Sequence, residues 1–314
     1  MLLSIVSPVY MSRNIVEPLV TQITDAATKI TTDFEIVLVD DGSKDNSWEE
    51  IERMATLHAN VKGIKLSRNF GHNFAITAGL ANAIGDFVVV MDCDLQENPV
   101  YIVDLYNKIL EGYDIIFTEK PKREFGFLKN LTSSIFLWAC NFLVDDSFMN
   151  ATNAIGNMSI LSRKAVNGFL SFNDYRRQYL AVLRWLGYKA GFIQIVHQKR
   201  YEGKSSYTFF KMWKLALDTF VSLSDKLLRI TVGVGFVLSL IAFLSTVGIV
   251  IRYMFRPFAP GWASLAVLII FVGGIVTLSI GICGLYIGKT FEQTKHRPMY
   301  IIDETVNMTN SVQK

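Results

Sequence analysis

The sequence predicts an α/β domain with a mixed, mostly parallel sheet flanked by helices, followed by an amphipathic helix and two C-terminal transmembrane helices. Short apolar runs alternate with segments of helical spacing through the first half of the chain, which is the pattern of an α/β sheet. Two later stretches, residues 230–251 and 261–288, carry no charged residue. The 314 residues are 51% hydrophobic and the mean hydropathy is +0.30, which is too apolar for an ordinary soluble enzyme.

The elements of the α/β domain follow one another in strand–helix order. Apolar runs predict strands at residues 2–9, 35–39, 61–66, 87–91 and 113–118. Helical spacing predicts helices at residues 15–30, 47–59, 74–84 and 100–110. Further on, we expect a helix at 131–142, strands at 155–161 and 192–198, and a helix at 175–186. Strands that alternate with helices usually run parallel, so their carboxyl ends should meet at one edge of the sheet, where ligands bind.

The two uncharged stretches are each long enough to cross a bilayer, which takes about 20 apolar residues. A short polar connection, residues 252–260, lies between them. Basic residues flank the pair on both sides: Lys226, Arg229, Lys289, Lys295 and Arg297. Although Arg252 and Arg256 in the connection compete, the positive-inside rule favours both chain ends in the cytoplasm. Buried core helices are the alternative explanation, but two long uncharged runs in succession are rare in soluble folds.

Residues 208–229 predict an amphipathic helix, because Phe209, Trp213 and Phe220 share one face. This helix either lies in the membrane interface or packs against the α/β domain, and both alternatives stay open. The expected domains are the α/β domain, the amphipathic helix, the two-helix transmembrane domain and a cytoplasmic tail, at residues 1–207, 208–229, 230–288 and 289–314.

The N-terminus, the charge and the cysteines restrict the class of protein further. The chain begins without the basic start and long apolar segment of a signal peptide, so the α/β domain is expected to stay in the cytoplasm. The net charge of +3 is too small to argue for nucleic acid as a partner. Cys93, Cys140 and Cys283 show no metal-ligand spacing and no evident disulfide framework, which suits a reducing compartment.

Carboxylates follow two of the predicted strands. Asp40 and Asp41 come after the second strand, and Asp92 and Asp94 after the fourth. A lone D-x-D is most often a solvated turn, but here both pairs fall at the edge of the sheet where ligands bind. Mg²⁺ and Mn²⁺ prefer such hard oxygen ligands and commonly bridge substrate phosphates. The sequence therefore favours a metal–diphosphate site for a nucleotide-activated sugar.

A series of short motifs along the chain indicates the protein family to which this site is similar. The motifs are "SPVY" (7–10), "VDDGSKD" (39–45), "LSRNFGH" (66–72), "DCDLQENP" (92–99), "LSRKAV" (161–166), "RYEGKSSYTFFKMWKLALD" (200–218) and "RPMYII" (297–302). Each is weak alone. In this order, and with two apolar stretches between the last two, they resemble family-2 glycosyltransferases of the GT-A fold. Within that family the chain is similar to polyprenyl-phosphate glycosyltransferases, such as bactoprenol glucosyltransferases and dolichyl-phosphate mannose synthase.

The resemblance implies a role for several residues. Asp92, Asp94 and Gln96 match the motif that binds Mg²⁺ or Mn²⁺ and the diphosphate. Arg200 matches the arginine of R-x-x-G-x-S that approaches the phosphates, and with Asp94 it would be catalytic. The nucleotide-sugar site would also include Pro8, Tyr10, Asp40, which contacts the base, and Asp41, which orders its loop together with Asp45. The acceptor phosphate would be held by Lys120, Arg123, Lys129, Arg200 and Ser205. For the three residues within 120–129, a basic loop that faces solvent or lipid is the alternative explanation.

The resemblance also implies the reaction and its partners. An inverting enzyme would transfer a sugar from a nucleotide-diphosphate sugar, with UDP favoured, to a polyprenyl phosphate. Since that phosphate is already an anionic nucleophile at cell pH, no strong general base is needed. The protein would be a multi-pass protein of the bacterial inner membrane, with its catalytic domain in the cytoplasm. A homo-oligomer is an open alternative, and no nucleic-acid partner is expected.

Three departures from the family pattern are visible. Met11 and Ser12 stand where relatives commonly have Asn-Glu. Asn157 and Ser159 replace an acid and an arginine, and Ser206 replaces a lysine, although Lys204 is close. These departures allow a different donor sugar and leave open an inactive homologue that binds a nucleotide sugar. A membrane glycosyltransferase that acts directly on a glycan is a further alternative. A processive polysaccharide synthase is disfavoured, because Gln178 lies too far from Arg184 and Trp185 for that family's Q-x-x-R-W motif.

Overall fold

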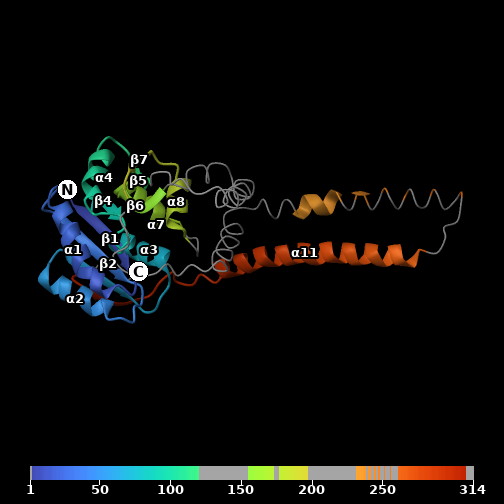
Figure 1. Ribbon diagram of the computed structural model, residues 1–314, viewed down its shortest axis with the longest axis horizontal. Coiled ribbons are helices and arrows are strands. Elements are labelled where there is room, and N and C mark those ends of the chain that lie inside the picture. Colours follow the sequence, from blue (N-terminus) through green and yellow to red (C-terminus); the bar gives the residue numbers. More distant parts are fainter. Residues whose placement is uncertain are drawn as a thin grey trace. The chain divides into compact units, whose positions relative to one another are not determined.

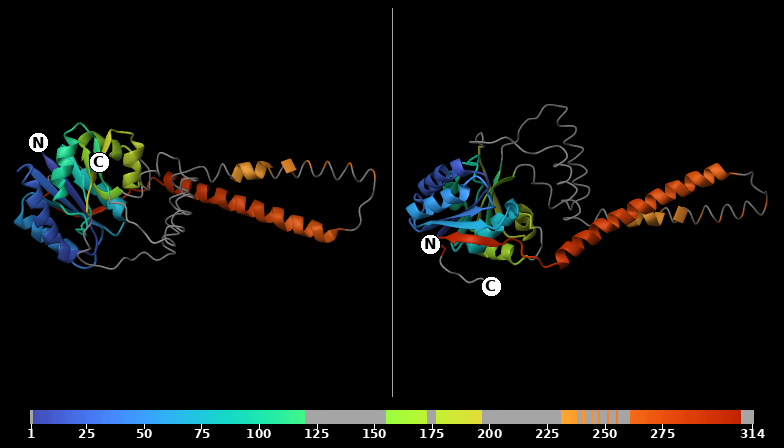
Figure 2. Two further views of the ribbon diagram at one scale, coloured as in Figure 1. Left: turned by 45° about the horizontal axis from the view of Figure 1, so that its top comes forward. Right: turned by 90° about the horizontal axis from the view of Figure 1, so that it is seen from below.

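Figures 1 and 2 show the protein as a computed structural model. The structure describes residues 2–119, 155–172, 177–196, 231–237 and 261–308, with a few positions between 240 and 255. The chain divides into two units, which are treated separately here. One unit comprises residues 1–126, 150–205 and 297–314, and the other comprises residues 127–149 and 206–296. Of each unit, the structure describes only the residues given above.

The first unit is built on a mixed sheet that has eight strands among the described residues, in the order β7-β5-β6-β4-β1-β2-β3-β8. The strands are β1 (Leu3–Val9), β2 (Phe34–Asp40), β3 (Val61–Leu66), β4 (Phe87–Val90), β5 (Ile115–Glu119), β6 (Ile155–Ser162), β7 (Ala190–Gln194) and β8 (Ile302–Val306). Strands β1 to β4 run parallel, β7 is parallel to β5, and β6 and β8 are antiparallel to their neighbours. The predicted mixed, mostly parallel sheet is confirmed.

Helices cover both faces of this sheet, as Figures 1 and 2 show. The described helices of this unit are α1 (Arg13–Ala27), α2 (Ser47–Leu57), α3 (His72–Asn82), α4 (Tyr101–Ile109), α7 (Arg163–Leu170) and α8 (Tyr179–Trp185). Helices α1, α2 and α4 contribute to one apolar core, and α3, α7 and α8 to the other. The buried strands explain why β1 and β2 read as continuous apolar runs rather than alternating ones.

Helix α3 packs unusually closely on the sheet, which brings its first residue near the strand ends. A Cβ on Gly79 would lie 2.3 Å from the Val6 side chain of β1. Only a residue without a side chain lets the helix approach so closely. The sequence places this helix two residues too late, at 74–84, and thereby leaves His72 outside it.

The order of the strands defines where a ligand binds in this class of sheet. Strands β2 and β3 lie on one side of β1, and β4 lies on the other. Successive strands are therefore added on one side of β1 as far as β3 and on its other side from β4 onward, while β1 and β4 themselves run parallel. In open α/β sheets, such a switch point leaves a crevice beyond the carboxyl ends of the two strands.

Strand β8 comes from the segment that the sequence treats as a tail. It pairs antiparallel with β3, from Ile302 beside Leu66 to Val306 beside Gly63. Glu304 accepts a hydrogen bond from Lys65 Nζ at 2.6 Å and another from the Trp48 indole at 3.2 Å. The C-terminal segment is thus part of the same sheet as β1 to β4, a feature missed at the sequence level because the strand is short and polar.

The second unit is described mainly by one long helix, α11 (Trp262–Thr294). Within it, the 21 residues Phe271–Phe291 are apolar enough to cross a membrane, with a mean hydropathy of 1.9 and none of that window buried. They overlap the second predicted span. The first predicted span, 230–251, lies mostly outside the described residues, as do the helices expected at 131–142 and 208–229. Two transmembrane helices are therefore not confirmed.

Candidate active site

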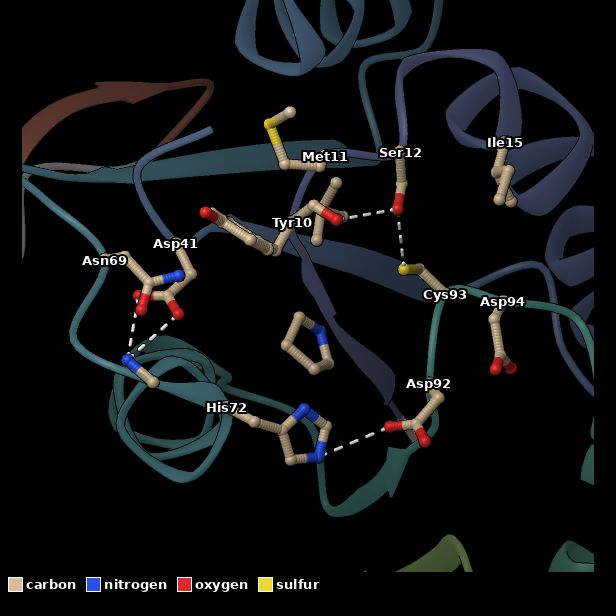
Figure 3. Close-up of a pocket in the computed structure, with 13 residues that line it drawn as sticks. Tyr10, Met11, Ser12, Ile15, Asp41, Asn69, His72, Asp92, Cys93 and Asp94 are labelled. Carbon is tan, nitrogen blue, oxygen red and sulfur yellow. Dashed lines mark hydrogen bonds and ion pairs between the residues drawn. The ribbon is translucent and has the colours of Figure 1, made fainter. Parts of the chain in front are cut away.

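A cavity of about 500 Å³ opens at the switch point between β1 and β4. Its lining comes from the segments that follow β1, β2, β3 and β4 (Figure 3): Pro8, Val9, Tyr10, Met11, Ser12, Ile15, Asp41, Asn69, Gly71, His72, Asp92, Cys93 and Asp94. Segments far apart in the sequence meet here because the parallel strands all end at this edge. The cavity thus lies where the strand order requires a ligand crevice.

Asp92 stands at one side of this cavity and is held at both carboxylate oxygens. The imidazole Nε2 of His72 lies 3.4 Å from Oδ1, and Figure 3 shows the two side chains pointing toward each other. The amide Nδ2 of Asn157, on β6, donates a hydrogen bond to Oδ2 at 2.6 Å. The side chain remains 27% exposed, so the carboxylate is fixed in direction but still reaches the cavity.

Asp94 lines the same cavity two residues later. Its Oδ1 accepts a hydrogen bond from the backbone N–H of Gln96 at 3.2 Å, which closes a local turn. Leu95, between them, adopts a left-handed backbone conformation with φ of 55° although its side chain is buried. This conformation is strained for a bulky residue, and such strain gathers at functional sites. This strained turn thus fixes the position of the Asp94 side chain relative to the end of β4.

Asp40, the last residue of β2, and Asp41, which follows it, have different positions. Asp40 is fully buried, and its carboxylate accepts hydrogen bonds from the Ser43 backbone N–H at 3.3 Å. Asp41 lines the cavity and accepts hydrogen bonds from the backbone N–H groups of Phe70 at 2.7 Å and Gly71 at 2.9 Å. Burial raises the pKa of both carboxyls. Asp40 therefore holds the turn at Ser43 and Asp41 holds the loop at Phe70 and Gly71, and of the two only Asp41 lines the cavity.

The loop after β1 is held by the loop after β2. Met11 has a left-handed backbone with φ of 51°, and its N–H donates to Ser43 Oγ at 2.9 Å. The side chains of Tyr10 and Met11 are about half exposed, at 49% and 50%. Cys93 Sγ donates to Ser12 Oγ at 3.6 Å, and burial raises the pKa of the Cys93 thiol to about 11. Met11 and Ser12, the first departure from the family pattern, are therefore part of the cavity wall.

Of the remaining predicted site residues, Gln96 is described by the structure and the acceptor-phosphate residues are not. Gln96 does not line the cavity. The predicted acceptor-phosphate residues Lys120, Arg123, Lys129, Arg200 and Ser205 lie outside the described residues. Within the described part of the chain, no group of three or more His, Cys, Asp or Glu side chains gathers into a metal site. The carboxylates that could share a metal ion at the cavity are Asp92 and Asp94.

Two residues of the site escaped the sequence analysis. His72 follows β3 within the motif "LSRNFGH", so its place at the carboxyl edge could have been inferred from the strand order. Asn157 was noted only as a departure from the family pattern. Its contact with Asp92 depends on β6 lying beside β4, and no local pattern reveals that pairing across 65 residues.

Comparisons with known proteins agree with this geometry. Residues 4–169 match the model of glycosyl transferase family 2. An uncharacterized glycosyltransferase of Synechocystis sp. is 30% identical over 96% of this chain and 95% of its own length. The prophage bactoprenol glucosyl transferase homolog of Escherichia coli is 30% identical over 96% of this chain and 98% of its own length. The bactoprenol glucosyl transferase of Shigella phage SfV is 32% identical over 86% of this chain and 88% of its own length.

The chain belongs to glycosyl transferase family 2, and its mixed, mostly parallel sheet with an acid-lined cavity at the switch point fits a GT-A-like fold. Its near-full-length likeness to bactoprenol glucosyl transferases confirms the resemblance predicted from the motifs. Among solved structures, glucosyl-3-phosphoglycerate synthase of Mycobacterium tuberculosis in complex with Mg²⁺ and UDP is 13% identical, with a TM-score of 0.49, over 70% of this chain and 77% of that one. Similarity at that level does not bear on the ligands of this chain.

Proposed function

We propose that the protein is a membrane-attached, inverting glycosyltransferase that transfers a sugar from a UDP-sugar to a polyprenyl phosphate. The observation that carries this proposal is the reach of the similarity to bactoprenol glucosyl transferases, which covers 96% of the chain in one relative. The family model itself ends at residue 169. The likeness therefore extends through the C-terminal region, where acceptor and membrane specificity would reside.

A divalent cation fits the acidic side of the cavity. Mg²⁺ commonly binds through one or two protein carboxylates, with water and substrate phosphates supplying the other ligands. Asp92 and Asp94 line one cavity and could provide that pair. When bound, Mg²⁺ or Mn²⁺ would neutralise charge on the departing nucleoside diphosphate. Gln96 is better placed to shape this turn through its backbone than to be a third ligand.

The side chains of this protein would then bind and orient rather than act as a base. A phosphate monoester is already an ionised nucleophile near neutral pH, because its second pKa is about 6. The task is to bring two anions together in line. Tyr10, Met11 and Asp41 would border the nucleotide, since they line the cavity opposite Asp92. Arg200 and the basic residues of 120–129 stay our candidates for the acceptor phosphate.

The membrane topology that we propose has an even number of crossings. The chain leaves the catalytic sheet after β7 and returns to the same sheet as β8, directly after α11. If α11 crosses the membrane once, at least one more crossing must lie between residues 197 and 261. The uncharged stretch 230–251 is the segment able to supply it. Both chain ends would then face the cytoplasm, in a bacterial inner membrane.

Radiolabel transfer tests the proposed reaction. Membranes that contain the protein are incubated with labelled nucleotide sugars and polyprenyl phosphate, with Mg²⁺ or Mn²⁺ or with EDTA, and the organic-extractable lipid is counted. We expect label from one UDP-sugar to enter the lipid, and EDTA to abolish it. Label that enters only a water-soluble glycan would favour the alternative acceptor. The absence of transfer from any sugar, with UDP still bound, would favour an inactive homologue.

Thiol labelling tests the proposed topology separately. In a cysteine-free variant, a cysteine at position 259 should react with an impermeant reagent added outside intact cells. A cysteine at position 310 should react only after the cells are opened. Labelling of position 310 from outside would reverse the proposed orientation.

A further inference from the structure

The loop that carries Asp92 and Asp94 is fastened to strand β6 at both of its ends. At its start, Asp92 Oδ2 accepts a hydrogen bond from the Asn157 side chain at 2.6 Å. At its far end, Glu97 accepts hydrogen bonds from the backbone N–H groups of Asn157 at 3.2 Å and Met158 at 2.6 Å. Asn157 therefore takes part in both attachments, through its side chain and through its backbone.

The attachment by Glu97 is buried and closely fitted. Glu97 is only 5% exposed although it is a carboxylate. A Cβ on Gly156 would lie 2.2 Å from its Oε1 and 2.3 Å from Thr118 Oγ1, so only glycine leaves room for the Glu97 side chain. Hydrogen bonds from backbone N–H groups to a buried carboxylate are strong and directional. Glu97 thus anchors the strand segment that presents Asn157.

The attachment by Asn157 sets the direction of Asp92. With Nδ2 of Asn157 on one oxygen and the His72 imidazole near the other, rotation of the Asp92 carboxylate would lose both contacts. An acid at position 157, which the family resemblance leads one to expect, would place a second carboxylate beside Asp92. Two carboxylates at that distance repel, whereas an amide can donate a hydrogen bond.

The second departure on the same strand is accommodated in a similar way. Ser159 shares a hydrogen bond of 2.8 Å with the hydroxyl of Tyr179, and both side chains are buried. The Tyr179 backbone N–H donates to Asn73 Oδ1 at 3.0 Å, next to His72 at the start of α3. Asn157 therefore contacts Asp92 directly, while the contacts of Ser159 lead through Tyr179 to Asn73, the residue after His72.

We propose that Asn157 is a positioning residue that orients Asp92 toward the divalent cation, and that Glu97 holds Asn157 in place. The inference rests on the proposed metal-dependent function. It assigns a role in this chain to a residue that would otherwise count only as a loss from the family pattern. In this proposal Asn157 acts through the hydrogen bond that its amide nitrogen donates to Asp92, and not as a ligand of the cation.

A Mn²⁺ titration tests the inference directly. Mn²⁺ is added to the full-length protein in detergent at a fixed concentration of UDP, and bound Mn²⁺ is measured from the loss of the free-ion paramagnetic resonance signal. We expect Asn157→Ala to weaken Mn²⁺ binding about tenfold and Glu97→Gln to weaken it severalfold. Asn167→Ala is the matched control, because Asn167 is exposed on α7. Thermal unfolding of each variant shows whether the fold is kept.

A double-mutant cycle separates positioning from a general structural role. In an Asp92→Ala background, adding Asn157→Ala should change Mn²⁺ affinity less than about twofold, because the partner it orients is gone. Asn157→Asp should weaken binding at least as much as Asn157→Ala. Tighter binding by Asn157→Asp would overturn the proposal by making position 157 a ligand. Unchanged binding by Asn157→Ala, or equal effects in both backgrounds, would also overturn it. If the wild-type protein binds no Mn²⁺, the metal assignment fails and this inference fails with it.

Discussion

The two ends of strand β2 carry buried acidic groups with opposite characters. At the amino end, Glu35 is 3% exposed and accepts hydrogen bonds from Lys62 Nζ and Ser4 Oγ, each at 2.5 Å, and from the Ile84 backbone N–H at 2.7 Å. At the carboxyl end, Asp41 faces a cavity shared with Asp92 and Asp94. Within the described residues, Asp92 contacts a histidine and an amide, neither of which is a permanent cation.

The difference shows which end serves stability and which serves function. A buried carboxylate matched by a lysine and two further donors is satisfied without any ligand. Carboxylates that share one cavity repel one another, and a cation bound there would lower their energy. The amino edge is therefore satisfied within the fold, whereas the carboxyl edge is where we propose that a metal and a diphosphate bind. Each of the following predictions tests one side of this comparison.

The largest effect is expected at the carboxyl edge. Asp94→Ala should lower the rate of sugar transfer by about a hundredfold or more, because a contact to a charged transition state is worth roughly 3 kcal/mol. Its thermal unfolding midpoint should stay close to that of the wild-type protein, since the side chain lines a cavity. Transfer of radiolabelled sugar into lipid, beside scanning fluorimetry, measures both. Near-normal transfer by Asp94→Ala would remove this residue from the metal site.

At the amino edge we expect the reverse. Glu35→Gln should destabilise the protein by about 3 kcal/mol, since it leaves Lys62 without its buried carboxylate. This corresponds to a fall of roughly 6–12 °C in the unfolding midpoint for a domain of this size. The transfer rate per folded molecule should be unchanged below that midpoint. A Glu35→Gln protein that is fully stable but inactive would contradict the division between the two edges.

The last of these predictions concerns the chemical reactivity of Cys93, which lies between the two aspartates. Burial raises its pKa to about 11, so only about one thiol in a thousand is ionised at pH 8. With Cys140 and Cys283 replaced by serine, alkylation of Cys93 at pH 8 should be about a hundredfold slower than that of a solvent-exposed cysteine. The rate should rise about tenfold per pH unit up to about pH 11. Rapid, pH-independent alkylation would show that this edge is more open than the structure indicates.

The sequence predicted the parts of this picture that depend on local pattern. The buried strands β1, β2 and β4 and the aspartates that follow them are visible because apolar runs end abruptly in acids. Since parallel strands share an edge, even the meeting of Asp41 with Asp92 could be expected. The family motifs indicated the chemistry that the carboxylates alone leave open.

What the sequence did not predict depends on pairing between distant segments. Asn157 contacts Asp92 only because β6 runs antiparallel beside β4. Strand β8 has no apolar periodicity, and it forms because β3 offers a free edge with Lys65 and Trp48 as partners for Glu304. The contrast between Asp40 and Asp41 likewise depends on a distant segment, since Asp40 is bonded by the nearby Ser43 whereas Asp41 is bonded by Phe70 from the loop after β3.

Calorimetric titration of UDP into the full-length protein, with Mn²⁺ and with EDTA, tests the central claim most directly. If the carboxyl edge is a metal–diphosphate site, UDP should bind with Mn²⁺ and lose about a hundredfold or more in affinity with EDTA, because the acidic cavity then repels the diphosphate. Asp94→Ala should bind UDP equally weakly under both conditions. UDP binding of equal affinity with Mn²⁺ and with EDTA in the wild-type protein would contradict the claim.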